Sequence, residues 1–212
     1  MSSFPGTPRT VPGAIVAVDP GSGLSRAAVF QYNPDEVTRT LRPRSPSGGA
    51  AEVDRVYGAP TQTIAMKVEL DATDGLESGD PVATLTGVSA GLAVLEMLLY
   101  PSVSRVVTNT VLLAAGTIEV LPPRAPLAVL AWGPGLVVPV KLESVTVTEQ
   151  AFDAATLVPT RAAVDLSLQV LTYDDLAPTD PAHALFLAHQ TVRERLAAAA
   201  GALGVARLAQ GA

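Results

Sequence analysis

The chain has 212 residues, of which 48% are hydrophobic and 16% are charged, and it contains no cysteine. This composition is typical of a globular domain with an aliphatic core, and it excludes bulk disorder, disulfides, thiolate nucleophiles and cysteine-ligated metal sites. Fourteen basic against twenty acidic residues give a net charge of −6, which argues against a protein that binds nucleic acid through its charge.

No targeting or membrane segment is evident in the sequence. Residues 1–8 lack the basic start and the apolar run of a secretory signal, and the most apolar stretch, 127–140, is interrupted by glycine and proline. We therefore expect a soluble protein that is made in the cytoplasm and does not insert into a membrane.

Short segments of two-residue alternation, separated by glycine- and proline-rich turns, predict a mainly β fold of antiparallel meanders. The two clearest strands place Met66 and Leu166 on their apolar faces and Lys67 and Gln169 on their polar faces, and we expect them to contribute opposite halves of the core. In chain order, the expected strands are 14–19, 26–32, 36–42, 62–71, 126–132, 136–150 and 161–171. The strand over 136–150 changes phase, which predicts a β-bulge near Glu143–Ser144.

Two helices are expected to flank the strands. The first carries Val88, Leu92, Leu95 and Leu99 on one stripe and ends before Pro101. The second begins at Thr179–Asp180, with Pro181 as its first helical residue, and frays near Gly204. Its apolar stripe is formed by Leu185, Ala188, Val192 and Leu196. The expected organisation is a β domain over 1–175 and a helical extension over 176–212.

A long segment without periodicity, 43–60, separates two of the strands. Loops of this length in a compact domain are usually functional or disordered. Because Arg42, Arg44 and Arg55 offer flexible donors on an otherwise acidic chain, we expect this segment to be an assembly loop that contacts a neighbouring subunit.

The string Gly87-Val88-Ser89-Ala90-Gly91 matches the G-x-S-x-G pattern of hydrolases, after strand-like residues 82–86. With Asp153 or Asp165 and with His183 or His189, Ser89 would give a catalytic triad in the α/β-hydrolase order. The strand–helix alternation that such a sheet requires is missing from the sequence after residue 101. We therefore favour Ser89 as a helix N-cap and expect no enzyme.

Metal sites are also not favoured. His183 and His189 lie six residues apart on the expected C-terminal helix and point in roughly opposite directions, so they cannot hold one metal together. We expect each to be partly exposed or hydrogen-bonded. The acidic segment 71–80 lacks the spacing of a calcium loop and is expected to be a solvated turn.

One segment is more particular: Val29-Phe30-Gln31-Tyr32-Asn33-Pro34-Asp35-Glu36-Val37-Thr38-Arg39-Thr40. Physically it is a strand, an Asn-Pro kink and a second strand that leaves in a new direction. It resembles a segment near the start of the tube-domain proteins of contractile injection systems. Residues 129–133, 138–153 and 159–162 resemble a second stretch of the same family, in the same order.

The resemblance implies a tail-tube-like barrel of two packed antiparallel sheets with one or two helices. It also implies a structural role as a tube initiator or adaptor, a six-membered ring that joins the spike to the inner tube protein, beside baseplate wedge or sheath subunits. No cofactor is implied. Many relatives carry a C-terminal LysM module, where this chain has an alanine-rich helix. The residues that carry the resemblance are Phe30, Gln31, Tyr32, Asn33, Pro34, Glu36, Arg39, Trp132, Gly133, Glu149, Phe152 and Arg161.

Three other interpretations remain open from the sequence. A tail tube or tail terminator subunit of a true phage would share the same features. A serine hydrolase that uses Ser89 is a rival from another class. A free-standing β domain that binds a small ligand is the third, and it would be a stable monomer with an apolar cavity.

Overall fold

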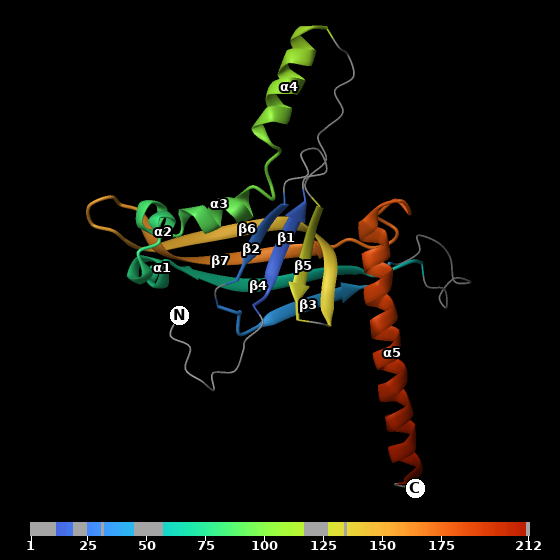
Figure 1. Ribbon diagram of the computed structural model, residues 1–212. Coiled ribbons are helices and arrows are strands. Elements are labelled where there is room, and N and C mark those ends of the chain that lie inside the picture. The colour runs from blue at the N-terminus through green and yellow to red at the C-terminus, as the bar shows by residue number, and fades with distance from the viewer. Residues whose placement is uncertain are drawn as a thin grey trace.

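The computed structural model describes residues 12–18, 25–30, 32–44, 57–116, 127–133 and 135–210. Within them the protein is mainly β with flanking helices, as the sequence predicts, and all seven expected strands are present in one antiparallel sheet (Figure 1). The strands are β1 (Ala14–Val18), β2 (Ser25–Val29), β3 (Val37–Arg42), β4 (Thr61–Asp71), β5 (Leu127–Trp132), β6 (Leu136–Phe152) and β7 (Pro159–Val170). The helices are α1 (Thr73–Ser78), α2 (Pro81–Thr86), α3 (Ser89–Glu96), α4 (Val103–Ala114) and α5 (Pro181–Gln210).

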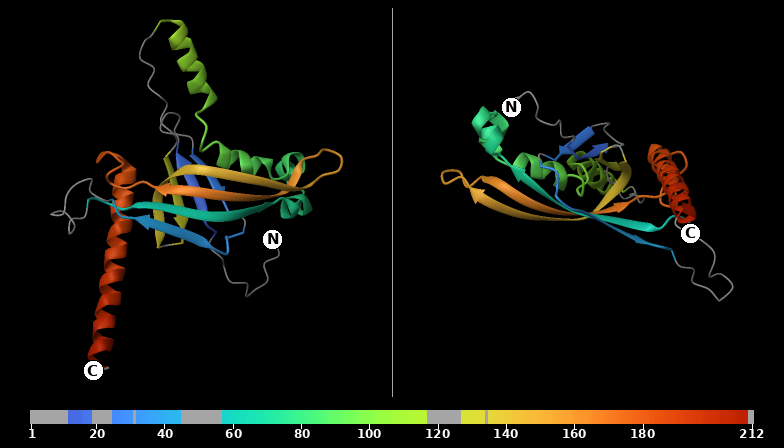
Figure 2. Two further views of the ribbon diagram at one scale, coloured as in Figure 1. Left: turned by 180° about the vertical axis from the view of Figure 1, so that it is seen from behind. Right: turned by 90° about the horizontal axis from the view of Figure 1, so that it is seen from below.

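The strand order is β2-β1-β5-β6-β7-β4-β3, so β6 stands in the middle and is shared by two arms. Residues 136–140 of β6 pair with β5, whereas residues 140–152 pair with β7, and the register shifts between Leu142 and Ser144. The expected bulge near Glu143–Ser144 is thereby confirmed. Where two packed sheets were expected, one continuous sheet bends along β6, and Figure 2 shows the short arm crossing one face of the long arm.

The long arm of the sheet, β6-β7-β4-β3, carries most of the apolar core. In β4 and β7 alternate side chains are buried, and the pairs Met66↔Leu166 and Val68↔Val164 lie side by side in the antiparallel register. These two strands are therefore neighbours in one layer, and the expectation that they form opposite halves of the core is wrong. The opposite half comes from β1, β5 and α3, which contribute Ile15, Leu130, Leu92 and Leu95 to the same cluster.

Three short helices follow β4, where the sequence predicts a solvated turn, a strand-like run and one helix. Residues 82–86 form α2 instead of a strand, because Pro81 fixes the first helical turn and the Asp80 carboxylate accepts a hydrogen bond from Val82 N at 2.9 Å. In α3 the N-cap is Val88, so Ser89 is the first helical residue and is not the expected cap. Val88, Leu92 and Leu95 are buried as expected, whereas Leu99 is exposed and Leu98 is buried in its place.

Helix α4 projects away from the sheet and covers no part of it (Figure 1). Its valines and leucines are exposed, among them Val103 at 73%, Val111 at 62% and Leu113 at 58%. The sequence analysis predicts no helix here, although Val103, Val106, Val107 and Val111 recur at the spacing of one helical face. That face is exposed in the structure instead of packing on the sheet.

Helix α5 packs one end against the sheet and leaves the rest outside it (Figures 1 and 2). It begins at Pro181 as expected, with Asp180 accepting a hydrogen bond from Ala182 N at 2.9 Å. The buried face is formed by Ala182, Phe186 and His189, whereas Val192 is 41% and Leu196 63% exposed. The expected stripe is therefore rotated, and the helix continues past Gly204 to Gln210.

None of the helices in the described part of the chain is long and apolar enough to span a bilayer.

Candidate functional site

The two sequence segments that carry the family resemblance meet at Gly13, just before β1. Phe30 N donates to Gly13 O at 2.8 Å, and Gly13 N donates to Asn33 Oδ1 at 2.9 Å. The ring of Trp132, from the end of β5, lies 6.2 Å from the buried ring of Phe30, measured between centroids. A Cβ at residue 13 would lie 2.4 Å from Trp132 and 2.8 Å from Phe30, so only glycine fits between the two rings. We call Gly13, Phe30, Asn33, Pro34 and Trp132 the motif corner.

The motif corner carries the chain from one edge of the sheet to the other. Strand β2 ends at Val29 and β3 begins at Val37, and these strands are the two outermost strands of the sheet. Pro34 stands in this connection, where it has no backbone donor to place in a ladder. The Asn33 side chain accepts a hydrogen bond from Gly13 N and so holds the segment just before β1. This arrangement agrees with the predicted kink between two strands.

A cleft of about 450 Å³ lies beside the motif corner, between the segment 32–36 and the polar face of β4. It is lined by Tyr32, Lys67 and Glu69, among others. Arg161 Nη2 donates to Glu69 Oε2 at 2.8 Å on this face, and that hydrogen bond raises the pKa of Arg161. Both side chains are about half exposed, so the pair contributes little stability and serves to order the surface.

Of the remaining motif residues, Glu36 also lines this cleft and Gly133 directly follows Trp132, whereas the others that the structure describes lie elsewhere. Glu36 Oε1 accepts a hydrogen bond from the Thr38 hydroxyl at 3.1 Å, and Gly133 adopts a φ of 63° in the turn between β5 and β6. Glu149 and Phe152 are exposed toward the far end of β6, where Phe152 pairs with Pro159. Arg39 is exposed on the edge strand β3. Gln31 lies outside the described residues.

Among the residues that the structure describes, β2 and β3 are the outer strands of the sheet, and each is paired on one side. Within the described residues, β2 pairs only with β1 and β3 pairs only with β4. Each edge therefore presents backbone N–H and C=O groups that a further strand can pair with. Alternate side chains of β2 are exposed, and Val29 on this strand is 56% exposed, while the residues of β3 after Val37 are all exposed.

The expected assembly loop is only partly described, since residues 45–56 and with them Arg55 lie outside the described residues. Arg42 is exposed at the end of β3. Arg44 is not the flexible donor that the sequence suggested, because its Nη2 donates to Asp175 Oδ1 at 3.1 Å and to the Thr172 hydroxyl at 3.4 Å. This side chain anchors the start of the segment to the body of the protein.

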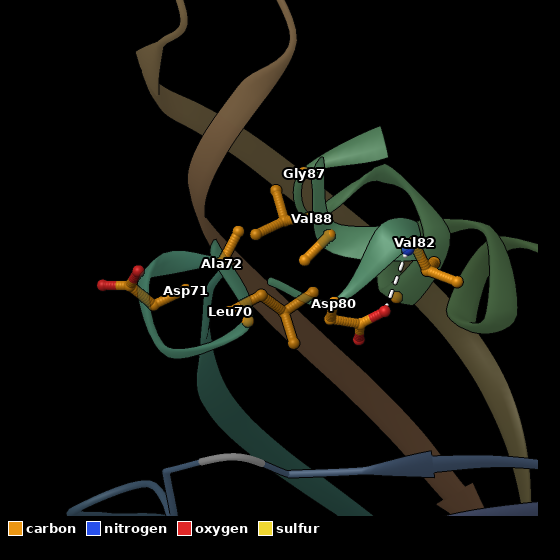
Figure 3. Close-up of a pocket in the computed structure, with 10 residues that line it drawn as sticks. Leu70, Asp71, Ala72, Asp80, Val82, Gly87 and Val88 are labelled. Atoms are coloured by element: carbon orange, nitrogen blue, oxygen red, sulfur yellow. Dashed lines mark hydrogen bonds between the residues drawn. The ribbon is translucent and has the colours of Figure 1, made fainter. Parts of the chain in front are cut away.

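The structure does not assemble the alternative hydrolase site. Ser89 lies in the first turn of α3, whereas His183 and His189 lie on α5 at the other end of the sheet (Figure 1). A pocket of about 280 Å³ next to α2 and α3 is lined by Leu70, Asp80, Gly87 and Val88, and no histidine lines it (Figure 3). Positive φ among the described non-glycine residues occurs only at Ala151 and Leu157, so Ser89 does not have the strained backbone of a nucleophile elbow.

Acidic residues in the segment 71–80 are used by the fold. Asp71 Oδ1 accepts from Thr73 N at 2.8 Å, and the hydrogen bonds from the Thr73 hydroxyl and backbone lower the pKa of Asp71. Asp80 caps α2. Over the described ranges, no three acidic or histidine side chains are grouped so that they could hold a metal ion.

A scan of the sequence against protein-family models finds no match, and a search among curated proteins finds no significant relative.

Proposed function

We propose that this protein is a structural subunit of a contractile injection system, which assembles in the cytoplasm into a six-membered ring between the spike and the inner tube. The proposal rests on the resemblance of two segments, 29–40 and 129–162, to tube-domain proteins. The contact of Phe30 with Trp132 supports treating the two segments as one unit, because side chains about a hundred residues apart in sequence build one corner.

The observation that carries the proposal is the pair of unpaired edges at β2 and β3. If β2 of one subunit pairs with β3 of the next, the sheet continues from subunit to subunit through backbone hydrogen bonds. Such a contact joins two different surfaces, and a contact of this kind closes into a ring when its rotation permits. The role needs no catalytic residue and no cofactor, since strand edges and apolar surfaces do the work.

The exposed apolar face of α4 also supports a subunit of a larger assembly. Large exposed apolar patches rimmed by polar residues mark interaction sites in soluble proteins. In the proposed ring, α4 stands away from the sheet and is free to contact an adjacent layer, either the spike or the first inner-tube ring. A phage tail tube or terminator subunit would use the same edges and remains the neighbouring alternative.

Engineered cysteines test the edge contact cleanly, because the chain has no cysteine of its own. Ala27→Cys places a thiol on an exposed position of β2, and Thr40→Cys places one on an exposed position of β3. We expect a mixture of the two single variants to form a covalent heterodimer on mild oxidation, because the two edges meet only between subunits. A chain that carries both changes should give a ladder that ends at six subunits.

The matched control is Thr40→Cys mixed with Lys141→Cys, which is exposed on the central strand β6. This mixture should not cross-link above the level of either variant alone. Equal cross-linking in the two mixtures, or none in the β2–β3 mixture, would show that the edges do not join subunits.

A further inference from the structure

A cavity of about 270 Å³ lies between the start of β4, the residues just before it and the first turns of α5. It lies beside the edge strand β3, because Gln62 pairs with Leu41 of that strand, but none of the residues that line it belongs to β2 or β3. Its lining joins Pro60 and Gln62 to Phe186, His189 and Arg193, from segments far apart in the sequence.

Two buried side chains in this lining have unused hydrogen-bonding atoms. Gln62 is 5% exposed and His189 is 7% exposed, and neither Gln62 Nε2 nor His189 Nε2 has a hydrogen-bond partner within the described residues. Leaving a buried donor unsatisfied is costly, and such groups in native proteins call for an explanation. Both residues line the cavity, so an acceptor bound there is the candidate partner of these two nitrogens.

The arginine at the cavity forms no ion pair among the described residues, although two carboxylates adjoin the wall: Asp174 Oδ2 accepts a hydrogen bond from Ala59 N, and Asp175 Oδ2 accepts one from Thr172 N. Arg193 lines the cavity, and Arg39 on β3 is close enough to lower the pKa of Arg193, in addition to the larger effect of burial. No acidic side chain in the described ranges forms an ion pair with either arginine, and Glu194 instead accepts a hydrogen bond from Gln190 at 3.2 Å. Two like charges held near one another favour an anion between or beside them.

His189 contributes as a neutral group. Burial, followed by the charges of Arg193 and Arg39, lowers the pKa of His189, so its imidazole is uncharged near neutral pH. A neutral imidazole can donate one hydrogen bond from Nε2, as the Gln62 amide can from its nitrogen. The site therefore offers two neutral donors and a guanidinium.

The rest of the wall is mixed, with the polar side chains of Thr172 and Gln190 beside an apolar part. The rings of Tyr173 and Phe186 lie 5.8 Å apart in an edge-to-face arrangement, and Ala59 and Pro60 complete this side. A cavity that combines a few convergent polar groups with aromatic walls is typical of a small-molecule site.

We propose that this cavity binds a small monocarboxylate with an apolar substituent, with its carboxylate on Gln62, His189 and Arg193 and its substituent against Phe186. A planar carboxylate has two oxygens that each accept hydrogen bonds, which fits two separate neutral donors and one guanidinium. A phosphate carries more charge than this partly apolar cavity compensates.

Titration of the full-length protein with phenylacetate, followed by calorimetry, tests the proposal, with phenylacetamide as the uncharged probe. We expect saturable binding of phenylacetate and at least tenfold weaker binding of the amide. Gln62→Leu and Arg193→Met should each weaken phenylacetate about tenfold or more, the usual effect of losing a hydrogen bond to a charged group. Lys141→Met, a charge-matched change on β6, should leave the affinity unchanged.

Gln62→Leu gives a second readout that does not depend on the probe. Without ligand, this variant should melt at the same temperature as the parent protein or higher, because it removes an unsatisfied buried donor. Absence of saturable binding, equal binding of acid and amide, tighter binding of inorganic phosphate, or unchanged affinity in both variants would overturn the proposal. None of these outcomes bears on the ring contact, which the cysteine variants test separately.

Discussion

The β4–β7 pair and helix α4 use similar apolar residues in opposite ways. In β4 and β7 the alternate side chains are buried, with Val68, Val164 and Leu168 each at 0% exposure, whereas in α4 Val103 and Val111 are more than half exposed. Burial of apolar area inside the chain stabilises the subunit itself. The apolar area of α4 contributes little to the described part of the subunit, and the proposed assembly would use it for contacts between molecules.

The largest effect should come from a charge in the buried layer. Met66→Asp or Leu166→Asp should cost on the order of 4–5 kcal/mol or more and abolish soluble expression, because the carboxylate has no partner in the core. Lys67→Gln, on the exposed face of the same strand, should change stability by less than about 0.5 kcal/mol. The yield of soluble protein and the free energy of unfolding in urea should be measured for the buried and the exposed variants. Equal tolerance of the two changes would contradict the assignment of the faces.

A moderate effect is expected at the motif corner. Gly13→Ala places a methyl group against Trp132 and Phe30, which should cost about 1–3 kcal/mol through overpacking. Gly135→Ala is the matched control, since a Cβ at residue 135 meets nothing within 4 Å and Gly135 has no positive φ. If the two variants unfold at the same urea concentration, the aromatic rings of Trp132 and Phe30 do not pack tightly against Gly13.

Acid should weaken the anchor between the chain before β4 and the chain after β7. Burial alone would raise the pKa of Asp175, but hydrogen bonds from Thr172 and Arg44 outweigh it and lower this pKa below its ordinary value. A lowered folded pKa stabilises the protein above the unfolded value of about 4, and this contribution is lost as the pH falls through the folded pKa. Asp175→Asn should therefore cost about 1 kcal/mol at pH 7 and progressively less as the pH falls from 4 toward 2. A constant difference across this pH range would show that the carboxylate is not bound.

The smallest effect on stability is expected in α4. Val107→Asp and Val111→Asp should shift the free energy of unfolding by less than about 0.5 kcal/mol, because both side chains are exposed already. The same variants should lose the contact with an adjacent layer in assembled particles, while Thr108→Asp on the same helix serves as the control. A loss of stability comparable to Met66→Asp would show that α4 packs on the subunit.

The same contrast explains what the sequence could predict. Strands with one buried face alternate in sequence, and so the seven strands and the bulge at Ser144 are predictable from local pattern. Valines recur at helical spacing in α4, so its existence was predictable, whereas its exposure is not readable from the pattern. Helix α5 has apolar residues on all sides, so the pattern misplaces its buried face. The bend of the sheet could not be predicted, because it depends on β6 pairing with β5 along its first part and with β7 along the rest.

The candidate sites divide in the same way. The motif corner could be predicted as a kink, but its contact with Trp132 depends on the fold of 100 intervening residues. The cavity proposed to bind a carboxylate could not be predicted from local sequence. In the sequence, Gln62 is only the first residue of an expected strand, and His189 is one residue of an expected alanine-rich helix. Only the fold brings these two unsatisfied side chains together.

The oligomeric state of the purified protein tests the central claim most directly. Negative-stain images of the full-length protein, together with its mass in solution, should show rings with sixfold symmetry and six times the mass of one chain. Pairing of β2 with β3 between subunits, together with the six-membered ring that the family resemblance implies, predicts that result. A uniform population of single globular subunits at every concentration would contradict the claim that these edges join the protein into a ring.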